Sequence, residues 1–378
     1  MIYLDNAATS HPKPAEPLQR ALARYLELGA SPGRGGYDRA VAAEMAVAAV
    51  RQRIAGFFGA GEGARVCFAA NATDALNTLI QGLISPGDHV ISSRLDHNSV
   101  LRPLHHLKRR GIIDLELTPF DSRGLIDPGA IEAAMRRETR LVVVTHASNV
   151  LGSIQPVAEI GAICRKRGVP LVLDTAQSAG LIPIAMADWH VQGLAFTGHK
   201  SLLGPTGIGG LVFGPELDPR PIRYGGTGTD SDSLFQPQEY PNRLEPGTVN
   251  LFGILALDEG LDYLAVRQTN HLHHEMRLTR RLIDGLAQLP KIRLLPTDLS
   301  APRLPLIACA LDGLSSQDAG AILDGDFDIA VRAGLHCAPL VHQDLSTLTS
   351  GAIRFSPGPF TTEEEIDRAI EAMTMIAR

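Results

Sequence analysis

Lys200 has the surroundings of a lysine that reacts rather than of one that is solvated. The chain has 35 basic residues, of which 5 are lysines. Lys200 follows Thr197-Gly198-His199 and precedes a glycine-rich stretch at 204–209. An amine that forms a Schiff base needs partial desolvation, which lowers its pKa, and backbone that a ligand can approach closely. The sequence therefore indicates a carbonyl-binding lysine here, rather than a solvated loop residue.

The remaining lysines stand in polar or helix-like segments, where we expect exposure to solvent. They are Lys13, Lys108, Lys166 and Lys291.

Polar residues of complementary chemistry follow five apolar runs that we expect to be strands. Ligands of open α/β sheets bind at the carboxyl ends of the strands. Thr73 opens a helix after the first run, and a helix N-terminus with a hydroxyl can bind phosphate. The residues after the later runs are His97, Asn149, Asp174, Gln177, Thr197 and His199. Each alone could be a helix cap, a turn residue or a buried histidine. Together they offer a phosphate cradle, a stacking imidazole, an amide, a carboxylate and an amine, which is what a pyridoxal phosphate site needs.

Alternating strands and helices must position these residues. Helical spacing of apolar residues predicts helices over 15–28 and 38–58. From residue 65 onward, short apolar runs alternate with helical segments, which predicts βαβ units and a mainly parallel sheet. The expected strands are 66–69, 89–92, 115–117, 141–145 and 171–173, and the expected helices are 73–84, 98–110, 129–136 and 156–167.

The second half of the chain predicts a smaller α+β unit. Residues 214–248 are rich in Gly, Pro, Asp and Ser and are expected to form a long functional loop. A long helical stretch is predicted over 251–289. Strands near 304–311 and 327–332 and helices near 316–324 and 362–377 follow. Because 378 residues exceed what one core usually serves, we predict a large domain over 14–255 and a small domain made of 1–13 and 256–378.

Bulk composition excludes several classes of function. The chain is 44% hydrophobic, with a formal charge of −6 and a pI near 6.1. It therefore offers no basic face for nucleic acid, and no apolar run is long enough to span a membrane. The four cysteines form no C-x-x-C pair, and we expect no metal site and a reducing, cytoplasmic location.

The motifs together resemble the class V, fold-type I pyridoxal-phosphate enzymes, specifically the cysteine desulfurase and selenocysteine lyase family. The resemblance runs from the N-terminal Tyr3-Leu4-Asp5-Asn6-Ala7-Ala8-Thr9 to the last helix. It is carried by the segments at 173–180, 196–200, 204–209, 245–248 and 332–337. It implies the fold-type I architecture, with a seven-stranded, mainly parallel sheet between helices and a smaller α+β domain. It also implies a homodimer and pyridoxal 5′-phosphate as cofactor.

The resemblance implies a role for each residue on the cofactor. Lys200 would carry the aldehyde, and Asp174 would pair with the pyridine nitrogen. Gln177 and Asn149 would hydrogen-bond the phenolic oxygen, and His97 would stack on the ring and assist proton transfer. The expected phosphate-binding residues are Ala72, Thr73, Thr197 and His199, with Thr248 reaching in from a second subunit. Ala72 replaces the Thr or Gly of many relatives, which removes one side-chain contact.

Arg354 and Cys337 would act on the substrate. Arg354 resembles the arginine that grips the substrate carboxylate, next to Asn149 and Ala7, and its planar fork suits that task. Cys337, in Arg332-Ala333-Gly334-Leu335-His336-Cys337, resembles the nucleophile that takes sulfur from L-cysteine and leaves L-alanine. The short stretch between Cys337 and Arg354 is similar to that of members with a short cysteine loop. A small thiol or a partner protein would then accept the sulfur.

Three alternatives remain open at this point. The substrate could be L-selenocysteine, whose weaker C–Se bond would be cleaved by the same path. The chain could be another class V enzyme, such as an aminotransferase, an epimerase or a C–S lyase, which would not need Cys337. It could also be a non-catalytic protein that keeps the fold, although such a protein would not need Lys200 or Asp174.

Overall fold

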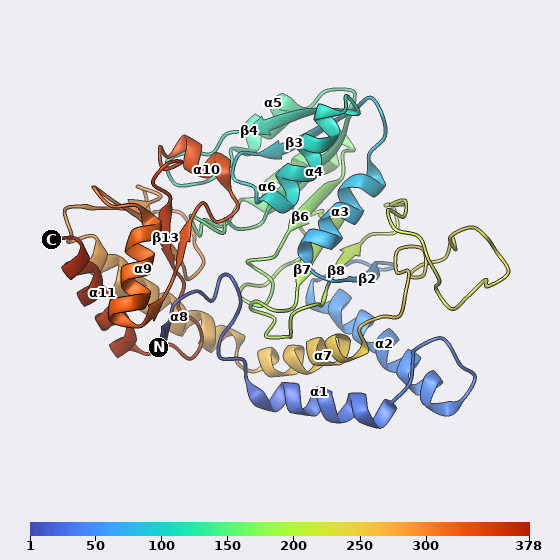
Figure 1. Ribbon diagram of the computed structural model, residues 1–378. Helices are drawn as coiled ribbons and strands as arrows, with labels where there is room; N and C mark the ends of the chain where they lie inside the picture. The colour runs from blue at the N-terminus through green and yellow to red at the C-terminus, as the bar shows by residue number, and fades with distance from the viewer.

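The computed structural model describes residues 1–378 and is built around a seven-stranded sheet (Figure 1). The strand order is β2-β8-β7-β6-β5-β3-β4. Only β8 runs against its neighbours, β2 and β7, while the other pairs are parallel. The strands are β2 (Arg65–Ala69), β3 (Asp88–Ser93), β4 (Ile113–Thr118), β5 (Thr139–Thr145), β6 (Leu171–Asp174), β7 (Gly193–Thr197) and β8 (Gly209–Phe213). The predicted α/β fold with a mainly parallel sheet is confirmed.

Helices cover both faces of this sheet, which is why its central strands are apolar throughout. In β5, Leu141 and Val143 pack on one face, against α3 (Ala72–Leu83) and α4 (Asn98–Arg109). Val142 and Val144 pack on the other, against α2 (Asp38–Phe57), α6 (Val157–Arg167) and α7 (Leu251–Ala265). Two further helices, α1 (Ala15–Leu28) and α5 (Pro128–Ala134), complete this part, with α1 lying along α7 (Figure 1).

A second, antiparallel sheet of order β12-β13-β10-β9 lies to one side. Its strands are β9 (Ile292–Leu295), β10 (Ile307–Leu311), β12 (Arg332–Gly334) and β13 (Ala352–Phe355). It has its own apolar core with α8 (Gln268–Leu286), α9 (Ser316–Phe327) and α11 (Glu363–Ile376), and α10 (Pro339–Asp344) follows β12. The N-terminal strand β1 (Ile2–Tyr3) pairs in parallel with β11 (Ile329–Ala330), so the N-terminus lies with the C-terminal segment. The domain bounds given above stay a prediction.

The long helical stretch predicted over 251–289 is divided into two helices, α7 and α8. The break falls at Val266 and Arg267, where Arg267 has φ −126° and ψ −19°. No Gly or Pro marks it. The reason is tertiary: α7 is buried in the core of the large sheet, whereas α8 buries one face in the core of the second sheet. Residues 214–250 contain no helix or strand, in line with the predicted loop, which projects from the body in Figure 1. No helix is long and apolar enough to cross a membrane.

A buried ion pair fixes α2 to the end of that loop. Arg51 donates to both carboxylate oxygens of Glu245, at 2.6 and 2.7 Å, and the backbone N–H of Phe68 donates to the same carboxylate at 2.5 Å. Glu245 is 5% exposed and Arg51 is 17% exposed. The pair therefore connects α2, β2 and the segment that leads to Thr248.

Arg51→Met should destabilise the fold by about 3 kcal/mol, because it leaves a buried carboxylate without its cation. Denaturant unfolding measures this. Arg277→Met is the matched control: its partner Glu363 and Arg277 itself are more than half exposed, so the change should cost less than about 1 kcal/mol. Equal losses in both variants would contradict the structural importance of the Arg51–Glu245 pair.

Candidate active site

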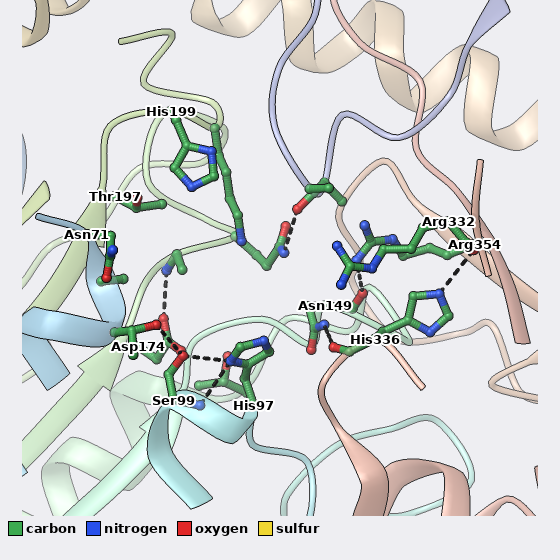
Figure 2. Close-up of a pocket in the computed structure, with 18 residues that line it drawn as sticks. Asn71, His97, Ser99, Asn149, Asp174, Thr197, His199, Arg332, His336 and Arg354 are labelled. Atoms are coloured by element: carbon green, nitrogen blue, oxygen red, sulfur yellow. Dashed lines mark hydrogen bonds between the residues drawn. The ribbon is translucent and has the colours of Figure 1, made fainter. Parts of the chain in front are cut away.

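A cavity of about 280 Å³ lies at the carboxyl ends of the large-sheet strands, and we call it the strand-end cavity. It gathers nearly all the residues predicted from sequence. Those that line it are Ala7, Ala72, Thr73, His97, Asn149, Asp174, Gln177, Thr197, His199, Lys200 and Arg354. Cys337 and Thr248 do not line it. Figure 2 shows Asn71, Thr197 and His199 on one side of the cavity and Arg332, His336 and Arg354 on the other.

The Asn71 side is made of neutral donors at a helix N-terminus. Asn71 caps α3 by accepting from the backbone N–H of Asp74 at 3.0 Å, so the first turn with Ala72 and Thr73 opens into the cavity. Thr197 Oγ1 and His199 Nδ1 are buried and have no protein partner. Burial, with the charges of Lys200 and Lys13, lowers the pKa of His199 to about 4, so its ring is neutral at pH 7. A helix N-terminus with free donors suits an anion.

His97 is held in one tautomer. It precedes α4, and its Nδ1 accepts the backbone N–H of Ser99 at 3.0 Å. Ser99 Oγ also lies 2.7 Å from this Nδ1 and 2.9 Å from Thr73 Oγ1. Burial, followed by the charge of Lys200, lowers the pKa of His97 to about 4. The neutral ring therefore carries its proton on Nε2.

Lys200 and Asp174 supply an amine and a carboxylate at the centre of the site. Burial lowers the pKa of Lys200 to about 8, against the opposing effect of Asp174. Burial raises the pKa of Asp174, while the N–H of Ala176 and the charge of Lys200 lower it. Gly180, at φ +91°, lies so close to the backbone after Lys200 that a Cβ would come within 2.4 Å of Ser201 O. Only glycine permits this approach.

The other side of the cavity holds a buried arginine. Arg354 is 2% exposed; its Nη2 lies 2.8 Å from Asp5 Oδ1, and its Nη1 donates to the carbonyl of Asn149 at 3.0 Å. Its Nε has no partner. Gln177 donates to the carbonyl of Ala7 at 3.1 Å, which brings the N-terminal segment against the site.

Cys337 lies three residues beyond β12, beside the cavity, and its side chain is partly exposed. Its φ is +57° and that of His336 is +50°, two left-handed residues in succession. Both carbonyls are held: Asn149 Nδ2 donates to His336 O and the N–H of Asn98 donates to Cys337 O, each at 2.7 Å. The His336 ring donates from Nε2 to Arg332 O at 3.2 Å. The cysteine-bearing turn is thus fixed to the rim of the cavity.

Several lining residues were not predicted as site residues: Ala8, Asn71, Ser99, Thr145, Ala176, Arg332 and His336. Most stand within two positions of a predicted one, so the motifs did contain them. Asp5, the partner of Arg354, carried no signal beyond its place in the N-terminal motif, because the two residues are 349 positions apart.

Comparison with known proteins identifies the family. The model of the aminotransferase class-V family matches residues 2–369. A probable cysteine desulfurase of Methanothermobacter thermautotrophicus is 33% identical, across 100% of this chain and 94% of its own length. A cysteine desulfurase of Pectobacterium atrosepticum is 31% identical, across 100% and 93%. The apo cysteine desulfurase structure of Thermococcus onnurineus matches with a TM-score of 0.91 at 32% identity, covering 100% of this chain and 94% of that one.

The chain therefore belongs to the aminotransferase class-V family, whose enzymes use pyridoxal phosphate. These three relatives, which match it along its whole length, are named as cysteine desulfurases or as a probable one. These comparisons confirm the predicted family, the predicted fold, pyridoxal phosphate as the cofactor and cysteine desulfurase as the enzyme activity.

The strand-end cavity fits this cofactor. The unpartnered Thr197 Oγ1 and His199 Nδ1 are buried donors or acceptors that a phosphate group would satisfy, next to the first turn of α3. Asp174 is a buried carboxylate with one backbone donor, free to accept from a protonated ring nitrogen. Lys200 lies between these groups with an amine of lowered pKa.

Because burial lowers the pKa of Lys200 to about 8, its amine should react with the cofactor aldehyde near neutral pH. Only the neutral amine is nucleophilic, so the reaction rate of the cofactor-free protein should rise with pH and level off above pH 8. Borohydride trapping and mass mapping at each pH measure the adduct. An adduct on another lysine, or a rate still rising at pH 10, would refute this assignment.

Proposed function

We propose that the protein converts L-cysteine to L-alanine and captures the sulfur as a persulfide on Cys337. The observation that carries the proposal is the register of the second sheet. Arg332 and Arg354 are Cα partners across β12 and β13, and Cys337 lies three residues after the end of β12. A substrate whose carboxylate is bound at Arg354 would therefore have its side chain near the cysteine turn.

Pyridoxal phosphate, when bound, supplies a carbonyl carbon for the substrate amine and an electron sink for the Cα–H electrons. Lys200 is the base that takes the Cα proton, since its pKa near 8 lets a neutral amine persist at working pH. Asp174 holds a proton on the ring nitrogen. His97 lies at the start of α4 with Nε2–H as its donor, placed to move a proton at the substrate.

Arg354 orients the substrate. Its guanidinium is already held by Asp5 and the Asn149 carbonyl, so little side-chain entropy is lost when a carboxylate binds. Burial lowers the pKa of Arg354, yet the nearby Asp5 opposes the shift and keeps the group cationic. Asn149 also ties this arginine to the cysteine turn through His336 O.

For the sulfur step the protein supplies the thiol of Cys337, and the cofactor, when bound, would supply the electron sink. The Cys337 thiolate attacks the substrate sulfur, an S–S bond forms and the C–S bond breaks. The electron pair of the broken bond goes to the substrate carbon, which later takes a proton and leaves as L-alanine. The net change is L-cysteine and one thiol to L-alanine and one persulfide, so no external oxidant is needed.

The active assembly is proposed to be a homodimer with Thr248 contributed across the interface. Thr248 is exposed and lies outside the strand-end cavity of its own chain. Exposed apolar side chains stand at and on α2 and on the loop at 214–250 that carries Thr248: Tyr37, Val41, Met45, Tyr224, Leu234 and Phe235. A second copy would bury them.

The sulfur acceptor is proposed to come to the enzyme. Because Cys337 O is bonded to the N–H of Asn98, and 16 residues separate Cys337 from Arg354, the thiol has little freedom to swing outward. A small thiol or a partner protein must therefore reach the rim of the cavity. The four free cysteines suit a reducing, cytoplasmic setting.

Arg354→Lys should lower kcat/KM for L-cysteine by the equivalent of about 2 kcal/mol, because the ammonium cannot reproduce the fork that binds a carboxylate. Steady-state alanine release measures this at matched cofactor content. Arg303→Lys is the control: Arg303 also donates to a carbonyl, that of Leu151, but does not line the cavity. An unchanged kcat/KM in Arg354→Lys would contradict the proposal that Arg354 binds the substrate carboxylate.

The first turnover should be fast and later ones slow unless a thiol acceptor is present, because persulfide release from the tethered Cys337 limits the cycle. Alanine is measured in single and multiple turnovers, with L-cysteine and L-selenocysteine, with and without added thiol. Mass analysis should place one extra sulfur on Cys337.

Cys337→Ala should abolish the burst with L-cysteine, and Cys164→Ala, which changes a fully buried cysteine, should keep it. A Cys337→Ala variant with full activity would instead favour a C–S lyase or an aminotransferase.

A further inference from the structure

Lys13 is not the solvated residue that the sequence suggested. Its Nζ lies 2.7 Å from the carbonyl oxygen of His199 and 2.7 Å from Ser10 Oγ, and its side chain is partly buried. Burial lowers the pKa of Lys13 to about 8. The other three expected lysines, Lys108, Lys166 and Lys291, are exposed. Lys13 thus stands directly behind a residue that lines the strand-end cavity.

The segment before Lys13 holds the same turn. Thr9 Oγ1 donates to His199 O at 3.0 Å, the N–H of Ser10 donates to it at 3.2 Å, and Ser10 Oγ donates to Lys200 O at 3.1 Å. These contacts join residues about 190 positions apart. Lys13 is the only one of these groups that brings a charge.

Charge is what the Asn71 side of the cavity lacks. Its side chains from Asn71, Thr73 and Thr197 are neutral, and His199 is neutral at pH 7 because burial lowers its pKa to about 4. Arg223, near the start of α3, is paired with Asp74 at 2.7 Å. A phosphate monoester carries about −1.5 to −2 charges at pH 7, and a helix N-terminus offers only about +0.5. Lys200 would bond to the cofactor aldehyde, so its amine would not supply this charge.

We propose that Lys13 is a positioning residue for the cofactor phosphate, which holds the His199 turn and supplies from behind it the positive charge that the phosphate group needs. Lys13 does not line the cavity and acts through His199. This inference rests on the pyridoxal-phosphate site, and it does not depend on which substrate the enzyme takes or on the role of Cys337.

The test compares two ligands that differ only in the phosphate. The full-length, cofactor-free protein is titrated with pyridoxal phosphate and with pyridoxal, and binding is followed by absorbance. Lys13→Met should weaken pyridoxal phosphate about tenfold at low salt, because a unit charge near a partly buried site acts at reduced dielectric. It should change pyridoxal binding less than twofold, and the difference should shrink in high salt. Lys13→Arg should recover most of the affinity.

Lys108→Met is the matched control, because Lys108 Nζ also donates to a backbone carbonyl, that of Leu115 at 3.2 Å, away from the site. It should leave both affinities unchanged. Equal weakening of both ligands by Lys13→Met would overturn the charge role and leave a purely structural one. Unchanged affinity for pyridoxal phosphate would overturn the proposal entirely. Neither readout needs turnover, so failure here is distinct from failure of the desulfurase assignment.

Discussion

The buried ion pair between Arg354 and Asp5 is the interaction on which the site depends. Arg354 belongs to β13 of the second sheet, and Asp5 follows β1 at the N-terminus. β1 in turn pairs in parallel with β11, so the N-terminal segment lies with the second sheet's part of the chain. Because Arg354 is almost fully buried, its charge must be matched where it stands. That requirement sets the position of the N-terminal segment, which then reaches Gln177, His199 and Lys200 through its own hydrogen bonds.

Burial favours the neutral forms of the ionisable groups in and around the cavity. His97, His199 and His336 all have lowered pKa values because desolvation disfavours their cationic forms, and the neighbouring cations act in the same direction. Lys200 is shifted by the same cause to a range where its amine can lose a proton. A site that binds a dianionic phosphate through neutral contacts needs positive charge from outside these contacts, and Lys13 stands behind His199, where we propose that it supplies this charge.

The turn that carries Cys337 is held by hydrogen bonds between segments that follow the two sheets. The large sheet offers Asn149 and the first N–H of α4 as donors, and the small sheet offers the two carbonyls of His336 and Cys337 as acceptors. Two successive left-handed residues would be costly in an isolated loop. Here the contacts on both sides hold them, and the partly exposed thiol stays beside the cavity rather than in it.

Sequence alone was enough for strands β2 to β6 of the large sheet, because buried parallel strands between amphipathic helices leave a regular pattern, and it did not give the bounds of β7 or of the antiparallel β8. It was also enough for the polar residues after the strands, because the strand ends of one sheet share an edge. Motif spacing also pointed to Lys200, Asp174 and His97. Tertiary structure decided the rest. The break between α7 and α8 contains no Gly or Pro. It arises because α7 packs in the core of the large sheet and α8 packs in the core of the second sheet. The pairing of Asp5 with Arg354 and the burial of Lys13 behind His199 join residues far apart in the chain. Local pattern carries no information on such contacts, since only packing determines which distant carbonyl or carboxylate a charged side chain meets.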